Sequence, residues 1–201
     1  LSPWRRIKKK FGSSFRGEGS ILASREEWAK PALNAQAYIQ GRPATTSFAC
    51  WAGELIGAIH AEVLQEAWAN GPATVVKIVT NDQMETNARK IALRFGLSGV
   101  HGLDYVIDET TKIPWLVEIN PRLTQTAHLA LGRGRDLASC LLECAIKRPV
   151  VPRQVKIDSE LIALFPQEIL RDRNSAFLRS AYHDVPSNNP DFTGAVFGKK
   201  V

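Results

Sequence analysis

The chain is organised around the segment Trp115-Leu116-Val117-Glu118-Ile119-Asn120-Pro121-Arg122, an apolar strand that ends in polar side chains. Because residues i and i+2 of a strand share a face, Glu118 and Asn120 point to the same side, with Arg122 just beyond them. The opposite side is expected to face the core and to carry Trp115, Val117 and Ile119. Polar groups that gather in this way on one face indicate a binding site rather than a packing pattern.

A second carboxylate is expected opposite this strand. Residues 102–108 form another apolar strand, and the polar run 109–112 is suited to reverse the chain. A hairpin that folds about Thr111 places Asp104 across from Glu118 on one face. Facing carboxylates repel each other, so the pair is expected where a cation compensates it. The alternative is two solvated acids on an open sheet face. Two carboxylates and an amide oxygen suit Mg²⁺ or Mn²⁺ better than zinc or copper.

These two strands resemble the metal-binding end of the ATP-grasp superfamily, where a Gly-x-Asp strand precedes Val-Glu-Ile-Asn-Pro-Arg by about a dozen residues. The resemblance covers about residues 7–147 and is most specific at 100–122. It implies Mg²⁺ or Mn²⁺ on bound ATP, with the metal ligands Asp104, Glu118 and Asn120. It also implies that Arg122 is the catalytic cation that steadies the transferring phosphoryl or acyl-phosphate group.

The resemblance further implies an α+β ATP-grasp fold, with a small N-terminal lid remnant and a larger antiparallel-sheet subdomain with flanking helices. Residues 1–34 are expected to form the lid remnant and residues 35–148 the core subdomain with the metal site. Residues 149–201 are expected to form a C-terminal extension of unknown role. Apolar spacing predicts a helix at 82–95 that Asp82 caps.

The N-terminal segment supplies a second part of the resemblance. Residues 7–22 lead from a basic strand into a run rich in glycine and serine, which suits the binding of an anion. The run is neither a Walker A loop nor a dinucleotide turn, but it resembles the ATP-grasp lid. The resemblance implies Lys10 as the phosphate lysine, with Lys8 as a competitor of the same strand parity. The loop positions that it implies at the phosphates are Ser13, Ser14, Gly17 and Gly19.

The net charge of +6 is concentrated at the N-terminus, where residues 1–16 contain six basic side chains and no acid. Such a cluster raises the local concentration of a polyanion, so nucleic acid is an alternative to ATP. Nucleic acid is disfavoured because the basic strand face lacks the repeated aromatic side chains that stacking platforms require. A solvated basic strand edge is the further alternative.

Two more segments are expected to contact the nucleotide. Residues 35–41 read as a short strand and resemble the hinge between lid and base, so the resemblance implies that the Gln36 side chain binds nucleotide. It implies that the hinge backbone holds the adenine edge at Ala37, Tyr38 and Ile39. Lys77 lies on a strand after a Gly-Pro loop, at a position where the resemblance implies a polar residue near the phosphates, so it is a candidate. Near the motif, the acceptor pocket is expected to include Gln125 and His128.

The resemblance implies a ligase that uses ATP and Mg²⁺, forms an acyl phosphate from a small carboxylate and joins it to an amine or similar nucleophile. A noncatalytic nucleotide-binding module, or an inactive fragment of such a ligase, is the alternative. Relatives carry a preceding substrate-binding domain, and this chain opens at Leu1 shortly before the lysine strand, so we expect a truncated chain. A homodimer is left open.

Three cysteines, at positions 50, 140 and 144, are expected to be buried free thiols of a reducing, cytoplasmic compartment. The sequence has no apolar run of about 18 residues, so no membrane span is expected. It also has no Ser-His-Asp or Cys-His arrangement that would indicate nucleophilic catalysis by the protein itself.

Overall fold

The computed structural model describes residues 36–151, 157, 159–186, 191 and 193–194. The chain divides into two compact units, Leu1–Tyr38 and Ile39–Val201, and the fold described below is that of the second unit. The lid residues expected at the phosphates lie outside the described residues: Lys8, Lys10, Ser13, Ser14, Gly17 and Gly19.

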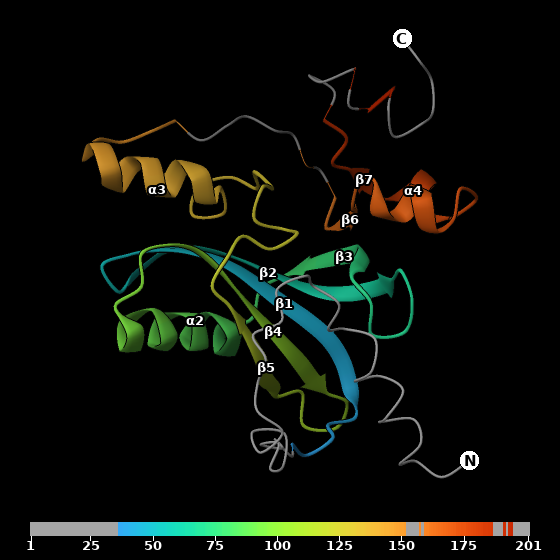
Figure 1. Ribbon diagram of the computed structural model, residues 1–201, viewed down its shortest axis with the longest axis horizontal. Helices are drawn as coiled ribbons and strands as arrows, with labels where there is room; N and C mark the ends of the chain where they lie inside the picture. The colour runs from blue at the N-terminus through green and yellow to red at the C-terminus, as the bar shows by residue number, and fades with distance from the viewer. Residues whose placement is uncertain (1–35, 152–156, 158, 187–190, 192, 195–201) are drawn as a thin grey trace, which may run out of the picture. The chain divides into compact units, whose positions relative to one another are not determined.

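A seven-stranded sheet with the order β5-β4-β1-β2-β3-β6-β7 forms the centre of this unit (Figure 1). All neighbouring strands are antiparallel except β6 and β7. This sheet and its helices confirm the predicted α+β class. The strands are β1 Gly41–Trp51, β2 Glu54–Glu66, β3 Ala73–Val79, β4 Gly99–Asp108, β5 Pro114–Asn120, β6 Leu161–Ala163 and β7 Tyr182–His183. The helices are α2 Asp82–Phe95, α3 Leu137–Ile146, α4 Gln167–Arg171 and α5 Phe177–Ser180.

The sheet is covered on both faces, and Figure 1 shows α2 and α3 on its opposite sides. Side chains alternate along each strand, so β1 and β2 contribute to two apolar clusters, one on each face. One cluster joins Phe48, Leu103 and Tyr105 of the sheet to the buried face of α2, made by Met84, Ala88 and Ala92. The other lies on the opposite face and joins Ile59, Ala61, Val76 and Ile78 to Leu129 and to Leu137 and Cys140 of α3.

Helix α2 occupies the predicted residues, but its N-cap differs from the prediction. Asn81 has extended backbone angles, and its side chain accepts hydrogen bonds from the backbone N–H groups of Gln83 and Met84. The prediction that Asp82 is the cap is therefore wrong. Asp82 is instead the first helical residue, where its charge favours the positive end of the helix dipole. Gly96 ends the helix with a φ of 57°.

The predicted strand at 35–41 is also wrong, because residues 36–40 have no regular secondary structure and β1 begins at Gly41. The neighbouring strand β4 explains why β1 does not begin earlier. Gly41 pairs with Asp108, which is the last residue of β4, and the chain turns after it. Residues before Gly41 therefore have no further length of β4 to pair with.

The C-terminal residues belong to the same sheet, because β6 pairs with β3 and the backbone N–H of Leu164 donates to the Thr74 carbonyl. All three cysteines are free, and Cys50 and Cys140 are buried. Among the described helices, none combines the length and the apolar character that crossing a membrane needs.

Candidate functional site

The hairpin of β4 and β5 places the two predicted acids opposite each other. Asp104 and Glu118 are partners in the strand register, which confirms the predicted pairing. The turn that sets this register is held by Asp108, whose Oδ1 accepts the backbone N–H groups of Thr111 at 2.7 Å and Thr110 at 2.8 Å. These bonds lower the pKa of Asp108, as expected for donors that favour the charged form.

A β-bulge interrupts the hairpin directly beside the acids. Tyr105 pairs with Leu116 while Asp104 pairs with Glu118, so Val117 is an extra residue without a partner on β4. The bulge reverses the alternation on its N-terminal side, and Trp115, which pairs with Val106, therefore shares the face of Asp104.

Apart from Pro114, which is buried, the apolar side chains of β5 are exposed among the described residues. Trp115 is 47% exposed, Val117 50% and Ile119 39%. The expectation that these three residues point together into the core is wrong for two reasons. The bulge separates their directions, and β5 is the edge strand of the described sheet.

Asn120 is held next to Asp104. Its Nδ2 donates a hydrogen bond of 2.7 Å to Oδ2 of Asp104, and the side chain is buried. One amide N–H is used in this bond, which leaves the amide oxygen to accept a hydrogen bond or ligate a cation. Glu118 lies on the same face and is exposed. The predicted metal ligands are therefore brought together.

These residues line a cavity of about 460 Å³, which we call the site cavity. Arg122 and Gln125 line it too, as do several residues that were not predicted, among them Thr45, Glu66 and Leu164. The charged residues of the lining are Asp104, Glu118 and Glu66 against Arg122, and this excess of negative charge favours a cation. Within the described ranges, no three His, Cys, Asp or Glu side chains gather closely enough to hold a metal alone.

The loop after β5 is pinned to the sheet by hydroxyl groups. Ser47 Oγ hydrogen-bonds to Oγ1 of Thr124 at 2.5 Å and to Oγ1 of Thr126 at 2.7 Å. Gln125 Nε2 donates to the Ala73 carbonyl at 3.2 Å. Gly102 allows this approach, since a Cβ there would lie 2.2 Å from Cγ2 of Thr124. The loop that carries Arg122 is therefore fixed close to the acids.

Thr45, Glu66 and Leu164 reach the cavity from three other strands or strand ends, so no local motif pointed to them. Thr45 of β1 pairs with Asp104 of β4. Its place in the cavity could be predicted only if the register of the two strands were known. Glu66 ends β2, where its carboxylate accepts the backbone N–H of Asn70 at 3.1 Å. Leu164 follows β6, more than forty residues beyond the motif.

Other candidates lie elsewhere. Lys77 of β3 pairs with Glu62 of β2, and Glu62 pairs with Ala44 of β1. Residues that pair in this way share a face, so Lys77 lies on the α2 face of the sheet and Asp104 lies on the opposite face. The Nζ of Lys77 lies 3.8 Å from Oε2 of Glu160. His128 Nε2 lies 2.7 Å from Oδ2 of Asp184 and is not part of the cavity lining.

The predicted hinge residues precede β1. Gln36, Ala37 and Tyr38 are exposed and belong to the first compact unit, whereas Ile39 is half-buried and opens the second. Their expected contacts with a nucleotide stay predictions.

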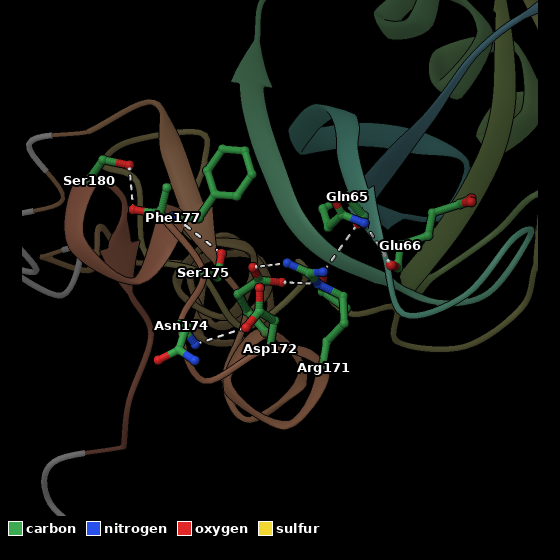
Figure 2. A network of polar contacts seen from close by, with 11 residues as sticks. Gln65, Glu66, Arg171, Asp172, Asn174, Ser175, Phe177 and Ser180 are labelled. Carbon is green, nitrogen blue, oxygen red and sulfur yellow. Dashed lines mark hydrogen bonds and ion pairs between the residues drawn. The ribbon is translucent and has the colours of Figure 1, made fainter.

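Helix α4 contains a buried ion pair, and Figure 2 shows Arg171 of this helix near Gln65 of β2. Glu168, 1% exposed, accepts hydrogen bonds from Nε of Arg171 at 2.8 Å and from Nη2 at 2.6 Å. Burial by itself would raise the pKa of Glu168, but bonds from Arg171, Ser175 and Thr74 lower it to about 2. Arg171 and Gln65 line a second cavity, which shares Pro43, Val63 and Glu66 with the site cavity.

The model of the ATP-grasp domain family matches residues 6–126 of this chain. A search of curated proteins finds no match. Among solved structures, a protein of Archaeoglobus fulgidus assigned to the ATP-grasp superfamily is 21% identical, with 58% of this chain and 38% of that one covered and a TM-score of 0.39.

Two further solved structures are similar at the same level. The N5-carboxyaminoimidazole synthase of Aspergillus clavatus is 17% identical, with 57% of this chain and 32% of that one covered and a TM-score of 0.38. The L-amino acid ligase of Bacillus licheniformis is 13% identical, with coverages of 57% and 31% and a TM-score of 0.38. The chain thus spans well under half the length of these proteins.

Proposed function

This chain belongs to the ATP-grasp family, and we propose that it is the nucleotide-binding part of an ATP- and Mg²⁺-dependent ligase. The observation that carries the proposal is the register pairing of Asp104 with Glu118, with Asn120 hydrogen-bonded to Asp104 in the same cavity. Two facing carboxylates with one nearby guanidinium, that of Arg122, are expected where a cation binds.

The donor set suits Mg²⁺. It contains two carboxylates and one amide oxygen, which are hard oxygen ligands, and none of the three is sulfur or imidazole. Mg²⁺ is commonly held by one or two carboxylates together with the phosphates of a substrate, so three protein groups suffice. When bound, the metal would neutralise phosphate oxygens and stabilise the negative charge of the transferring group.

Arg122 is proposed to stabilise the anion that develops during transfer. Its Nη1 donates to the Leu123 carbonyl at 3.3 Å, and four other N–H groups of the guanidinium remain for phosphate or carboxylate oxygens. The loop that carries it is tied to β1 through Ser47 and to β3 through Gln125. A fixed cation costs little reorganisation at the moment of reaction.

The reaction that we propose is the activation of a small carboxylate as an acyl phosphate, followed by attack of an amine or a similar nucleophile. In the first step a carboxylate oxygen attacks the γ-phosphorus of ATP and ADP leaves. In the second step the amine attacks the acyl carbon, phosphate leaves with the electrons of the broken carbon–oxygen bond, the amine nitrogen loses a proton, and a carbon–nitrogen bond remains. Catalysis of this kind consists largely of positioning and charge stabilisation, and the paired acids, Asn120 and Arg122 would contribute both at the phosphates.

Calorimetry with ATP, in the presence of Mg²⁺ or of EDTA, tests the proposal on the full chain. Wild-type protein is expected to bind ATP only with Mg²⁺. Glu118→Gln keeps the shape of the side chain but removes the charge, so it should weaken binding at least tenfold, in the range that metal-site changes cause. Arg122→Ala should weaken binding less, because the metal remains.

Glu54→Gln is the matched control, because Glu54 is an exposed acid at the start of β2 and outside the site cavity. Equal affinity of wild type and Glu118→Gln would contradict the metal assignment. If binding is Mg²⁺-dependent but no ADP is released with any pool of carboxylates and amines, the chain is a noncatalytic nucleotide-binding module.

A further inference from the structure

Two neighbouring rows of side chains cross strands β1, β4 and β5 on the face of the site cavity. The registers align Thr45 with Asp104 and Glu118 in the first row, which we call the polar row. The next row on this face, two residues further along β4, is apolar and consists of Pro43, Val106 and Trp115. The apolar row is thus the direct neighbour of the proposed metal site.

The β-bulge is what brings Trp115 into the apolar row. In a regular hairpin in which Asp104 pairs with Glu118, Leu116 would pair with Val106, and Trp115 would point to the α2 face. The extra residue Val117 shifts the pairing by one, so Trp115 pairs with Val106 instead. The indole is 47% exposed on this face.

A ligand at the polar row can extend along the strands in one direction only. The row on the other side consists of Ser47, Gly102 and Asn120, and all three residues are buried. Thr124 covers this row, because it bonds to Ser47 and its Cγ2 occupies the space above Gly102. The open direction leads to Pro43 and Trp115, and Pro43 also lines both neighbouring cavities.

We infer that Trp115, in the apolar row, binds the base of the nucleotide by stacking against its flat face. This inference rests on the proposed function, which puts the phosphates at the polar row. At about 3.3 Å per residue the two rows are about 7 Å apart, which is within the length of a nucleotide. An indole that is apolar and partly exposed offers a base the large, flat contact that stacking requires.

Two probes separate the base from the phosphates: Mg²⁺·ATP and Mg²⁺·tripolyphosphate, which has no base. We expect Trp115→Ala to weaken Mg²⁺·ATP binding about tenfold, as the loss of one stacked base does, and to leave tripolyphosphate binding unchanged. Trp115→Phe should retain most of the ATP affinity, because it keeps an aromatic face. Trp51→Ala is the matched control. Trp51 is 46% exposed, like Trp115, but it is the last residue of β1, at the opposite end of that strand from Pro43 and the apolar row.

Fluorescence supplies a second readout. ATP should change the emission of wild type more than that of Trp115→Phe, whereas tripolyphosphate should change neither. Equal ATP affinity of wild type and Trp115→Ala, or an equal loss for both probes, would overturn the inference while the metal site stands. A dimer in sedimentation that Trp115→Ala dissociates would overturn it as well and assign Trp115 to a contact between copies. If wild type binds neither probe, the proposed function itself fails.

Discussion

Gly102 shows how one residue without a side chain shapes the site. It lies between Asn120 and Ser47 in the strand registers, and the Thr124 side chain fills the space above it. The close approach lets Thr124 bond to Ser47 at 2.5 Å and so fixes the loop that follows the metal ligands. A small residue at this position is therefore a requirement of the site.

Gly102→Ala should destabilise the protein by about 1–3 kcal/mol, the usual cost of forcing extra atoms into a packed region. The added Cβ would lie 2.2 Å from Cγ2 of Thr124, but 3.1 Å from its Oγ1. Combining it with Thr124→Ser, which removes the methyl group and keeps the hydroxyl, should restore part of the loss. Urea denaturation measures both changes. No rescue by the second substitution would show that Thr124 is not the source of the strain.

Helix α2 illustrates what capping contributes at the scale of one element. Its buried residues Met84, Ala88 and Ala92 follow the helical period, and this period predicted the helix. The start of the helix depends on the backbone angles of Asn81, with a φ of −147° and a ψ of 106°, and local composition did not distinguish Asn81 from Asp82.

Asn81→Ala should lower the free energy of unfolding by about 1 kcal/mol, because it removes the acceptor of two backbone N–H groups. Asp82→Ala should cost less, since only a favourable charge in the first turn is lost. Chemical denaturation of the two variants compares them directly. A larger loss for Asp82→Ala would mean that Asp82 is the cap in solution.

The short helix α4 should make stability depend on pH. The pKa of Glu168 is lowered to about 2, so its ion pair contributes fully above the ordinary carboxyl pKa and is lost as the pH falls through about 2. Glu168→Gln should lower the free energy of unfolding by roughly 3 kcal/mol at pH 7, as breaking a buried pair does. The difference in free energy of unfolding between wild type and this variant should shrink steadily below about pH 4.5.

Glu160→Gln serves as the comparison, since Glu160 is 75% exposed in its ion pair with Lys77 and such pairs contribute little. Denaturation from pH 2 to pH 7 measures both variants. If the difference between wild type and Glu168→Gln is independent of pH, the carboxylate is not charged in the folded protein.

At the scale of the whole molecule, residues far apart in the sequence complete one cavity. Thr45 comes from β1, Glu66 from the end of β2, and Leu164 from the segment after β6. The C-terminal residues thus contribute to the site, through β6 at the side of β3. A ligand bound there would contact several strands at once.

Mg²⁺·ATP should therefore stabilise the folded protein as a unit. At a free concentration 100 times its Kd, a ligand specific for the folded state adds about 2.7 kcal/mol. Thermal denaturation should show a higher Tm with Mg²⁺ and ATP together than with ATP and EDTA, and a smaller difference for Glu118→Gln. An equal increase in EDTA would mean that ATP binds without the metal.

The local signals were sufficient for much of the fold. The polar run about Thr111 between two apolar strands predicted the hairpin, and the register confirms that Asp104 faces Glu118. The prediction failed at the bulge, because strict alternation assumes that no residue is inserted, and the insertion of Val117 depends on how β4 and β5 pair. Lys77 was a candidate because its position resembles that of a polar residue near the phosphates in the family. The face of the sheet on which it lies depends, however, on the register of β3 with its neighbours.

The sequence by itself determined the family, the β4–β5 hairpin with its facing acids, and helix α2, because each depends on residues that are close together in the chain. Only the tertiary structure decided the rest: Trp115 on the face of the acids, Thr45 beside Asp104, and the burial of Glu168 with distant Thr74 among its hydrogen-bond partners. These arrangements follow from strand pairing and from packing between distant segments, and the periodicity of a single segment contains no information about either.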